Sequence, residues 1–139
     1  MFITSFDELF KRDEVLANYM TQKRVEGFTF GESRRIYINS DADPKRQRFT
    51  IAHELGHILL NHIESGKGSM AFRDSTSTKS SDPIELAANS FAAELLMPER
   101  LMVEMYKKTD SPSDLAVIFG VSIESMKRRI RRLEQIGAI

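Results

Sequence analysis

The 139-residue chain contains no cysteine. Disulfide frameworks, cysteine zinc fingers, iron–sulfur centres and thiol nucleophiles are therefore excluded. The sequence also lacks any apolar run of the roughly 18 residues that a helix needs to cross a bilayer. Its first ten residues carry Asp7 and Glu8 but no basic residue, which is the wrong polarity for a signal peptide. Together these absences predict a cytoplasmic protein in a reducing compartment, without membrane contact.

Net charge is absent as well, since 20 Lys and Arg residues balance 20 Asp and Glu residues. A neutral chain is not a general polyanion binder, although a local basic patch can still bind a partner. The hydrophobic content of 41% is ordinary for a globular protein, and the length suits one compact domain.

Local start and stop signals predict an α+β fold. Ser5 can cap a first helix that runs to about Met20. Two short strands, Phe28–Phe30 and Arg35–Asn39, are expected to form a hairpin or small antiparallel sheet. Residues 63–81 are rich in Ser and Thr and read as a loop, and residues 111–113 read as a linker. Helices are expected over residues 44–61, 82–97, 98–107, 114–119 and 122–135.

All three histidines fall between residues 53 and 62. Two of them belong to the run His-Glu-Leu-Gly-His at 53–57, at positions i and i+4 of a predicted helix, where two imidazoles can share a metal ion. Glu54 can then hydrogen-bond a water on that metal and accept its proton during attack on a carbonyl. The plainer interpretation is a surface pair or two satisfied core histidines, which would not need Glu54. His62, one turn further, is expected to be solvated or to cap the helix end.

A catalytic zinc site of this kind needs a third protein ligand. Ile63 excludes the layout that takes a histidine from further along the same segment. The other layout takes a glutamate from a downstream helix, and Glu85 stands near the start of helix 82–97. Asn89, one turn later, could accept the N–H of a ligating histidine. Glu94 and Asp74 remain competitors, and Glu85 could simply complement its helix dipole.

Three blocks of sequence, Arg48–His62, Glu85–Asn89 and Phe91–Pro98, resemble the ImmA/IrrE metallopeptidase family, and the resemblance covers about residues 30–110. It implies a zinc-dependent peptidase with one zinc ion per chain. The implied metal ligands are His53, His57 and Glu85, with Glu54 as the general base. A small antiparallel sheet would pack on the His-Glu-x-x-His helix and on a second helix that supplies the glutamate.

The same resemblance implies a protein substrate, usually a helix-turn-helix transcriptional repressor, so that the peptidase acts as an anti-repressor in a phage or mobile element. Some relatives are fused to or encoded beside a DNA-binding module, or act in toxin–antitoxin pairs. The alternative function is therefore a regulatory protein that binds DNA or a partner and whose metal site is not catalytic.

Residues 115–133 have a helix-turn-helix rhythm, with Gly120 in the turn and Ser122 able to cap the second helix. We therefore expect a zinc peptidase domain over residues 1–110 and a helical, helix-turn-helix-like extension over residues 111–139. The second helix could contact DNA, form a surface for the repressor, or be the solvated side of an amphipathic helix. Its candidate contact residues are basic: Lys127, Arg128, Arg129, Arg131 and Arg132.

Strand 35–39 could bind an extended substrate as a sheet edge. Tyr37 on this strand would then lend its hydroxyl to the site, or would simply fill the core. The loop at 63–81 is expected to form a flap over the metal or to be disordered.

Overall fold

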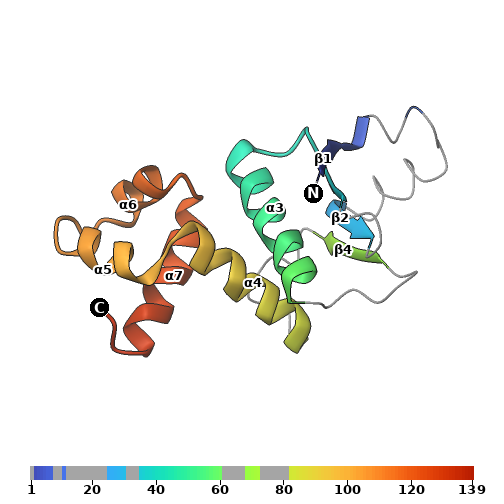
Figure 1. Ribbon diagram of the computed structural model, residues 1–139. Coiled ribbons are helices and arrows are strands. Elements are labelled where there is room, and N and C mark those ends of the chain that lie inside the picture. Colours follow the sequence, from blue (N-terminus) through green and yellow to red (C-terminus); the bar gives the residue numbers. More distant parts are fainter. Residues whose placement is uncertain (1, 8–10, 12–24, 31–34, 61–67, 73–81) are drawn as a thin grey trace.

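The structure, a computed structural model, describes residues 2–7, 11, 25–30, 35–60, 68–72 and 82–139. A sheet with helix α3 (Pro44–Leu59) lies at one end of the molecule, and helices α5 (Glu99–Tyr106), α6 (Pro112–Phe119) and α7 (Ile123–Gln135) lie at the other. Helix α4 (Pro83–Leu96) runs between the two ends (Figure 1). Within the described residues, no helix is long and apolar enough to cross a membrane.

The sheet has four strands in the order β1-β3-β2-β4. Strand β2 (Val25–Phe30) pairs antiparallel with β3 (Arg35–Ile38), which confirms the predicted hairpin. Strand β2 also pairs antiparallel with β4 (Gly68–Phe72), whereas β1 (Phe2–Ser5) runs parallel to β3. The α+β class is therefore confirmed, but the expectation of a purely antiparallel sheet is wrong, because β1 makes the sheet mixed.

Both unexpected strands change an earlier expectation. Strand β1 pairs with the edge of β3 that was expected to be free. Strand β3 is therefore an interior strand and cannot bind a substrate along its edge. Strand β4 lies inside the segment expected to be a loop. Residues 63–67 and 73–81 of that segment lie outside the described residues. Neither strand has an alternating apolar pattern, so each depends on its neighbour for its extended conformation.

The predicted first helix lies largely outside the described residues. Ser5 ends β1, and its hydroxyl oxygen accepts a hydrogen bond from the backbone N–H of Asp7 at 3.2 Å. Residues 6 and 7 are helical, which fits a helix beginning where Ser5 was expected to cap one.

Helices α3, α4, α6 and α7 each begin after a short polar residue. The side chain of that residue accepts a hydrogen bond from a backbone N–H in the first turn. Asp43 and Asp82 accept bonds from Lys45 and Ile84, both at 2.9 Å, before α3 and α4. In α3, α4 and α6 a proline follows the cap, where its missing N–H costs nothing. The expected linker at 111–113 is wrong, because Ser111 is the cap of α6 and the two following residues form its first turn. The cap of α7 is Ser122.

Helix α3 packs very closely on one face of the sheet. A Cβ built on Gly27 in β2 would lie 2.5 Å from Cγ2 of Thr50, so only glycine permits this approach. Ile36 and Ile38 pair with residues on the same face of β2 as Gly27, and both are buried. Phe28 and Tyr37 pair on the opposite face, with ring centroids 4.7 Å apart and nearly parallel.

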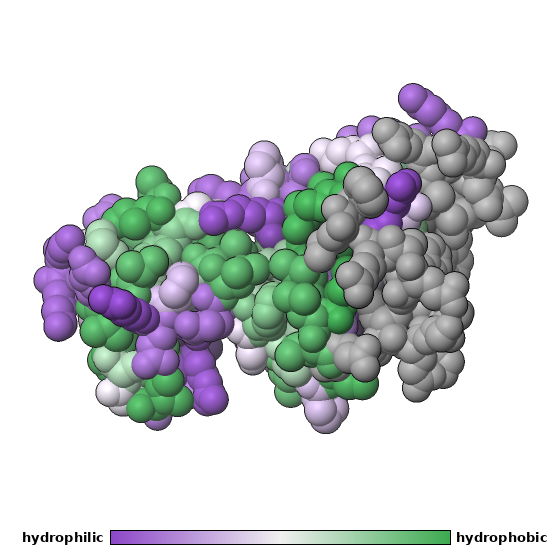
Figure 2. Space-filling view, viewed as in Figure 1, coloured by the Kyte–Doolittle hydropathy of each residue, from purple (hydrophilic) through white to green (hydrophobic). Residues whose placement is uncertain are grey.

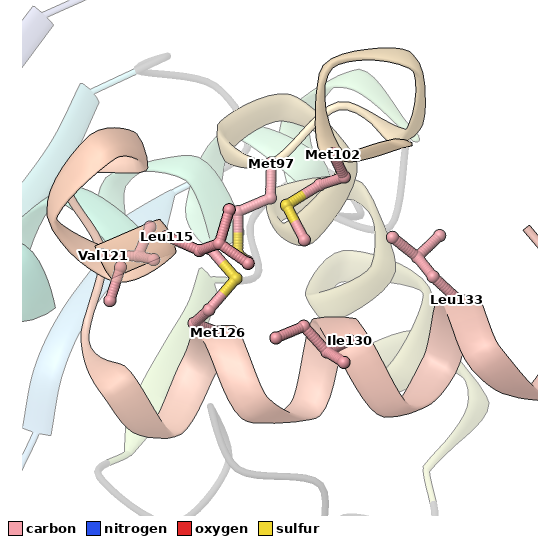
Figure 3. Packing of buried hydrophobic residues seen from close by; sticks show 8 residues of the cluster. Met97, Met102, Leu115, Val121, Met126, Ile130 and Leu133 are labelled. Carbon is pink, nitrogen blue, oxygen red and sulfur yellow. The ribbon is translucent and has the colours of Figure 1, made fainter. Parts of the chain in front are cut away.

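The end of α4 and helices α5 to α7 share a hydrophobic cluster (Figure 3). Met97, immediately after α4, points into it together with Met102 of α5 and Leu115 of α6 (Figure 3). Gly120 ends α6 in the left-handed conformation, at φ 65°, and α7 begins three residues later. The buried members of the cluster are Met97, Met102, Leu115, Ala116, Val121, Met126, Ile130 and Leu133.

Candidate metal centre

The two histidines of helix α3 face one another in the interior. Both are almost fully buried, and their Nε2 atoms are 3.1 Å apart. The rings meet edge to face, with an interplanar angle of 83°. Because these residues are one helical turn apart, the backbone of α3 alone brings the two nitrogens to one point.

The carboxylate of Glu85 in the first turn of α4 reaches the same point. One oxygen lies 3.1 Å from Nε2 of His53, and the other lies 3.0 Å from Nε2 of His57. Ligand atoms around a tetrahedral zinc ion are separated by roughly 3.4 Å, given bond lengths of about 2.0–2.1 Å. The three side chains thus form a compact donor set of two nitrogens and a carboxylate, with nearly the spacing that such an ion requires.

Asn89, one turn after Glu85 on α4, contacts the far side of the His53 ring. Its Oδ1 is 2.7 Å from Nδ1 of His53, the spacing of a hydrogen bond in which Nδ1–H donates to the amide oxygen. A neutral imidazole that carries its proton on Nδ1 has its lone pair on Nε2. Asn89 therefore favours the tautomer of His53 that directs a lone pair toward His57 and Glu85.

Glu85 is held as an anion in this arrangement. Burial raises the pKa of Glu85, but its hydrogen bonds with His53 and His57, and the positive charge of these imidazoles when they are protonated, outweigh the burial and bring the pKa from 4.5 down to about 2. The carboxylate is consequently available as a ligand at neutral pH.

Glu54 lies beside the two histidines and is fully buried. Its carboxylate and the histidine nitrogens all lie within 4.8 Å of one another. Each oxygen of Glu85, in comparison, lies 3.0 or 3.1 Å from one of the two Nε2 atoms. Both carboxylates are therefore close enough to the two histidines to act on a molecule bound there.

The close approach of α3 and α4 that creates the site depends on Gly56, in the middle of the histidine motif. A Cβ on Gly56 would lie 3.0 Å from a ring carbon of Phe91 and 3.3 Å from the Cα and carbonyl oxygen of Ala88. This role of Gly56 was not predicted from the sequence. The sequence signal for this role is a glycine inside a predicted helix. Glycine there lowers helix stability by up to about 1 kcal/mol relative to alanine, so its presence usually reflects close packing.

Comparison with known proteins agrees with this arrangement. Residues 14–131, most of the chain, match the peptidase family M78, described as the IrrE N-terminal-like domain. The chain belongs to this family. It is therefore a member of a metallopeptidase family, and the predicted resemblance is confirmed.

Three relatives of this IrrE-like chain come from a phage and two bacteria. An uncharacterized immunity region protein 2 of Bacillus phage phi105 is 33% identical over 112 residues, covering 80% of this chain and 63% of the relative. The radiation response metalloprotease IrrE of Deinococcus radiodurans is 38% identical over 79 residues, covering 55% and 23%. Its namesake from Deinococcus deserti is 30% identical over 122 residues, covering 88% and 40%. The chain spans less than two thirds of each of these relatives.

The other candidate residues of this IrrE-like chain lie away from the histidines or outside the described part. Glu94 is at the far end of α4, where it pairs with Arg129 and accepts the backbone N–H of Glu99. Tyr37 is on the sheet face opposite α3 and stacks on Phe28, which corresponds to the core-filling alternative. His62 and Asp74 lie outside the described residues.

The five basic residues of α7 have different environments. Arg129 is buried, its Nε donates to the backbone oxygen of Met97 at 3.0 Å, and its guanidinium pairs with Glu94. Arg128 pairs with Glu124 on its own helix. Arg129 therefore fastens α7 to the end of α4, whereas Lys127, Arg131 and Arg132 are exposed.

Arg48 makes a second connection, which the sequence analysis also missed. Its Nη1 donates to the backbone oxygens of Phe119 and Gly120 at 2.6 Å and 3.0 Å. The helix that carries the histidines is thereby tied to the end of α6. A Cβ at position 120 would lie 2.5 Å from this nitrogen, a second reason for glycine there.

Proposed function

We propose that the protein is a zinc-dependent endopeptidase of the kind in which two histidines and a glutamate from a second helix hold the metal. The observation that carries this proposal is the position of Glu85, whose two carboxylate oxygens face the Nε2 atoms of His53 and His57. Imidazole nitrogens and a carboxylate are the donors of many catalytic zinc sites with three protein ligands. One zinc ion per chain would occupy this site.

Zinc in such a site lowers the pKa of water and polarises the carbonyl of the scissile bond. In this proposal Glu54 accepts the proton of the attacking water on its carboxylate and then donates it to the leaving amide nitrogen. Its burial supports this role, since a carboxylate in the interior interacts strongly with nearby charges and protons. A purely structural metal site would have no use for it.

We propose a protein substrate, with a helix-turn-helix transcriptional repressor as the first candidate. The similarity to a phage immunity region protein supports a regulatory role. The alternative, a regulatory protein that binds DNA through α7 with a non-catalytic metal, accounts less well for Glu54. It also loses one of its five basic contacts, because Arg129 is bound inside the protein.

The test is co-production of the chain with candidate helix-turn-helix repressors from the same genome, followed by mass analysis of each repressor. Wild-type protein should produce two fragments, and Glu54→Gln should keep its zinc while cleaving about 100- to 10,000-fold more slowly. Glu99→Gln, an exposed change of the same chemistry, serves as the control. Cleavage by Glu54→Gln at the wild-type rate would contradict the assignment of the base, and a protein that takes up no zinc would contradict the whole proposal.

A further inference from the structure

A groove of about 570 Å³ lies between α4 and α7. Along α4 it is lined by Leu86, Asn89, Ala93 and Met97, among others, a spacing that follows one side of the helix. Asn89 belongs both to this lining and to the site, since it binds His53. One end of the groove therefore lies behind the His53 ring, on the side away from Nε2, and the other end lies where Arg129 joins α7 to the end of α4.

The charge of the groove has one dominant sign. Four arginines of α7 line it, Arg128, Arg129, Arg131 and Arg132, against one acidic residue, Glu94. Arg128 and Arg129 are occupied by ion pairs with Glu124 and Glu94. Arg131 and Arg132 are exposed and form no ion pair with the described part of the chain. Two guanidinium groups are thus presented at the groove for a partner carboxylate.

Half of the uncharged lining residues are apolar. Phe49 of α3 contributes with Leu86, Ala93 and Met97, and Leu86 is 40% exposed. Figure 2 shows hydrophobic side chains gathered over α3 and α4 in the middle of the molecule. An occupant that suits this groove therefore combines apolar and acidic side chains.

We propose that this groove binds an extended segment of the protein substrate that carries acidic and apolar residues. The inference rests on the proposed peptidase function and adds the chemistry of the substrate. From Leu86 to Met97, α4 rises roughly 16 Å at 1.5 Å per residue. An extended chain at about 3.3 Å per residue places about five residues along that length.

A polypeptide suits the groove better than duplex DNA. A duplex is read by a projecting element that enters its major groove, about 12 Å wide, whereas these arginines line a recess between two helices. Arg129 is also withdrawn from the surface by its bonds to Met97 and Glu94. An acidic side chain on an extended backbone can reach Arg131 and Arg132 without displacing either of those bonds.

The test uses fluorescence anisotropy with labelled peptides of about ten residues containing glutamate, leucine and serine, added to the zinc-loaded full chain at low salt. The glutamate peptide should bind, and the same peptide with glutamine in place of glutamate should bind at least about fivefold more weakly. Changing Arg131 and Arg132 together to Gln should cause a similar loss. The matched control changes Lys107 and Lys108 to Gln, which removes the same charge from the end of α5 and should alter affinity less than twofold.

Zinc content of each variant, measured on the same samples, separates this inference from the proposed function. Normal zinc content with equal peptide binding by wild type and the double arginine variant would overturn the groove assignment and leave the peptidase proposal intact. Equal losses in both double variants would also overturn it, because binding would then follow net charge. A 20-base-pair duplex that binds more tightly than the peptide, and depends on the same arginines, would overturn it in favour of DNA.

Discussion

At the scale of single residues, the candidate centre illustrates how neighbours determine what a histidine can do. His53 and His57 occupy equivalent places on α3, but the structure fixes His53 through Asn89. An imidazole with one nitrogen engaged as a donor offers the other nitrogen to a metal in a defined direction. Sequence spacing alone could suggest Asn89 for this role, because it lies one turn from Glu85.

Replacing Glu85 by alanine should abolish tight zinc binding, because it removes the carboxylate that faces both Nε2 atoms. Asn89→Ala should weaken zinc binding less, by about 10- to 100-fold, since it removes only the partner of a ligand. The measurement is zinc competition against a chromophoric chelator. Glu94→Ala is the control: it breaks the pair with Arg129 at the other end of α4 and should leave zinc affinity unchanged. Loss of zinc in Glu94→Ala with retention in Glu85→Ala would contradict the ligand assignment.

At the scale of elements, the site exists because α3 and α4 approach closely. The ring of Phe91 can turn away from a Cβ on Gly56, but the backbone of Ala88 can yield only if the whole helix shifts. The distance from Glu85 to the two histidines therefore depends on the small size of Gly56.

Gly56→Ala should lower zinc affinity by about tenfold or more, because separating the helices by a few tenths of an ångström displaces Glu85 from its partners. Alanine is the better helix former by about 1 kcal/mol, so helix content by circular dichroism should not fall. Ser90→Ala, an exposed change on α4, is the control. Zinc affinity equal to that of wild type in Gly56→Ala would show that the helices accommodate the methyl group without moving the ligands.

The elements that the sequence predicted are those with local signals. Asp43 and Pro44 mark the start of α3 on their own, and so do Asp82 and Pro83 for α4. Strands β1 and β4 were not predicted, because a short strand is stabilised mainly by pairing with its neighbour. The five residues of β4, Gly-Ser-Met-Ala-Phe, also show no alternation of apolar and polar side chains. The two histidines could be predicted from their own helix. Glu85 could not be chosen over Glu94 without the packing of Gly56 on Ala88.

At the scale of the whole molecule, α5 to α7 are not loosely appended. Met97 is almost fully buried at the centre of the C-terminal cluster, and it follows directly from the helix that carries Glu85 (Figure 3). The bonds from Arg48 to the end of α6 add a second connection. A change in the cluster should therefore alter the stability of the part that holds the site.

Leu115→Ala should lower the free energy of unfolding by about 2–5 kcal/mol, as expected for a fully buried leucine that leaves a cavity. Val117→Ala on the same helix is the control: Val117 is 74% exposed, and its loss should cost no more than about 0.5 kcal/mol. Urea unfolding followed by circular dichroism measures both. Added zinc should raise the unfolding midpoint of the whole chain, including α5 to α7. A first transition of the C-terminal helices that is insensitive to zinc would contradict this coupling.

Helix α4 belongs to both ends of the protein at once, with Glu85 in its first turn and Met97 immediately after its last. The amide protons in the middle of a helix exchange with solvent only when the helix opens, and an opening there releases the contacts at both ends. Exchange in α4 should therefore reflect the stability of both attachments together. A metal ion bound beside the first turn of α4 should then slow amide exchange in α7. The effect would pass through the shared helix and would need no change of conformation.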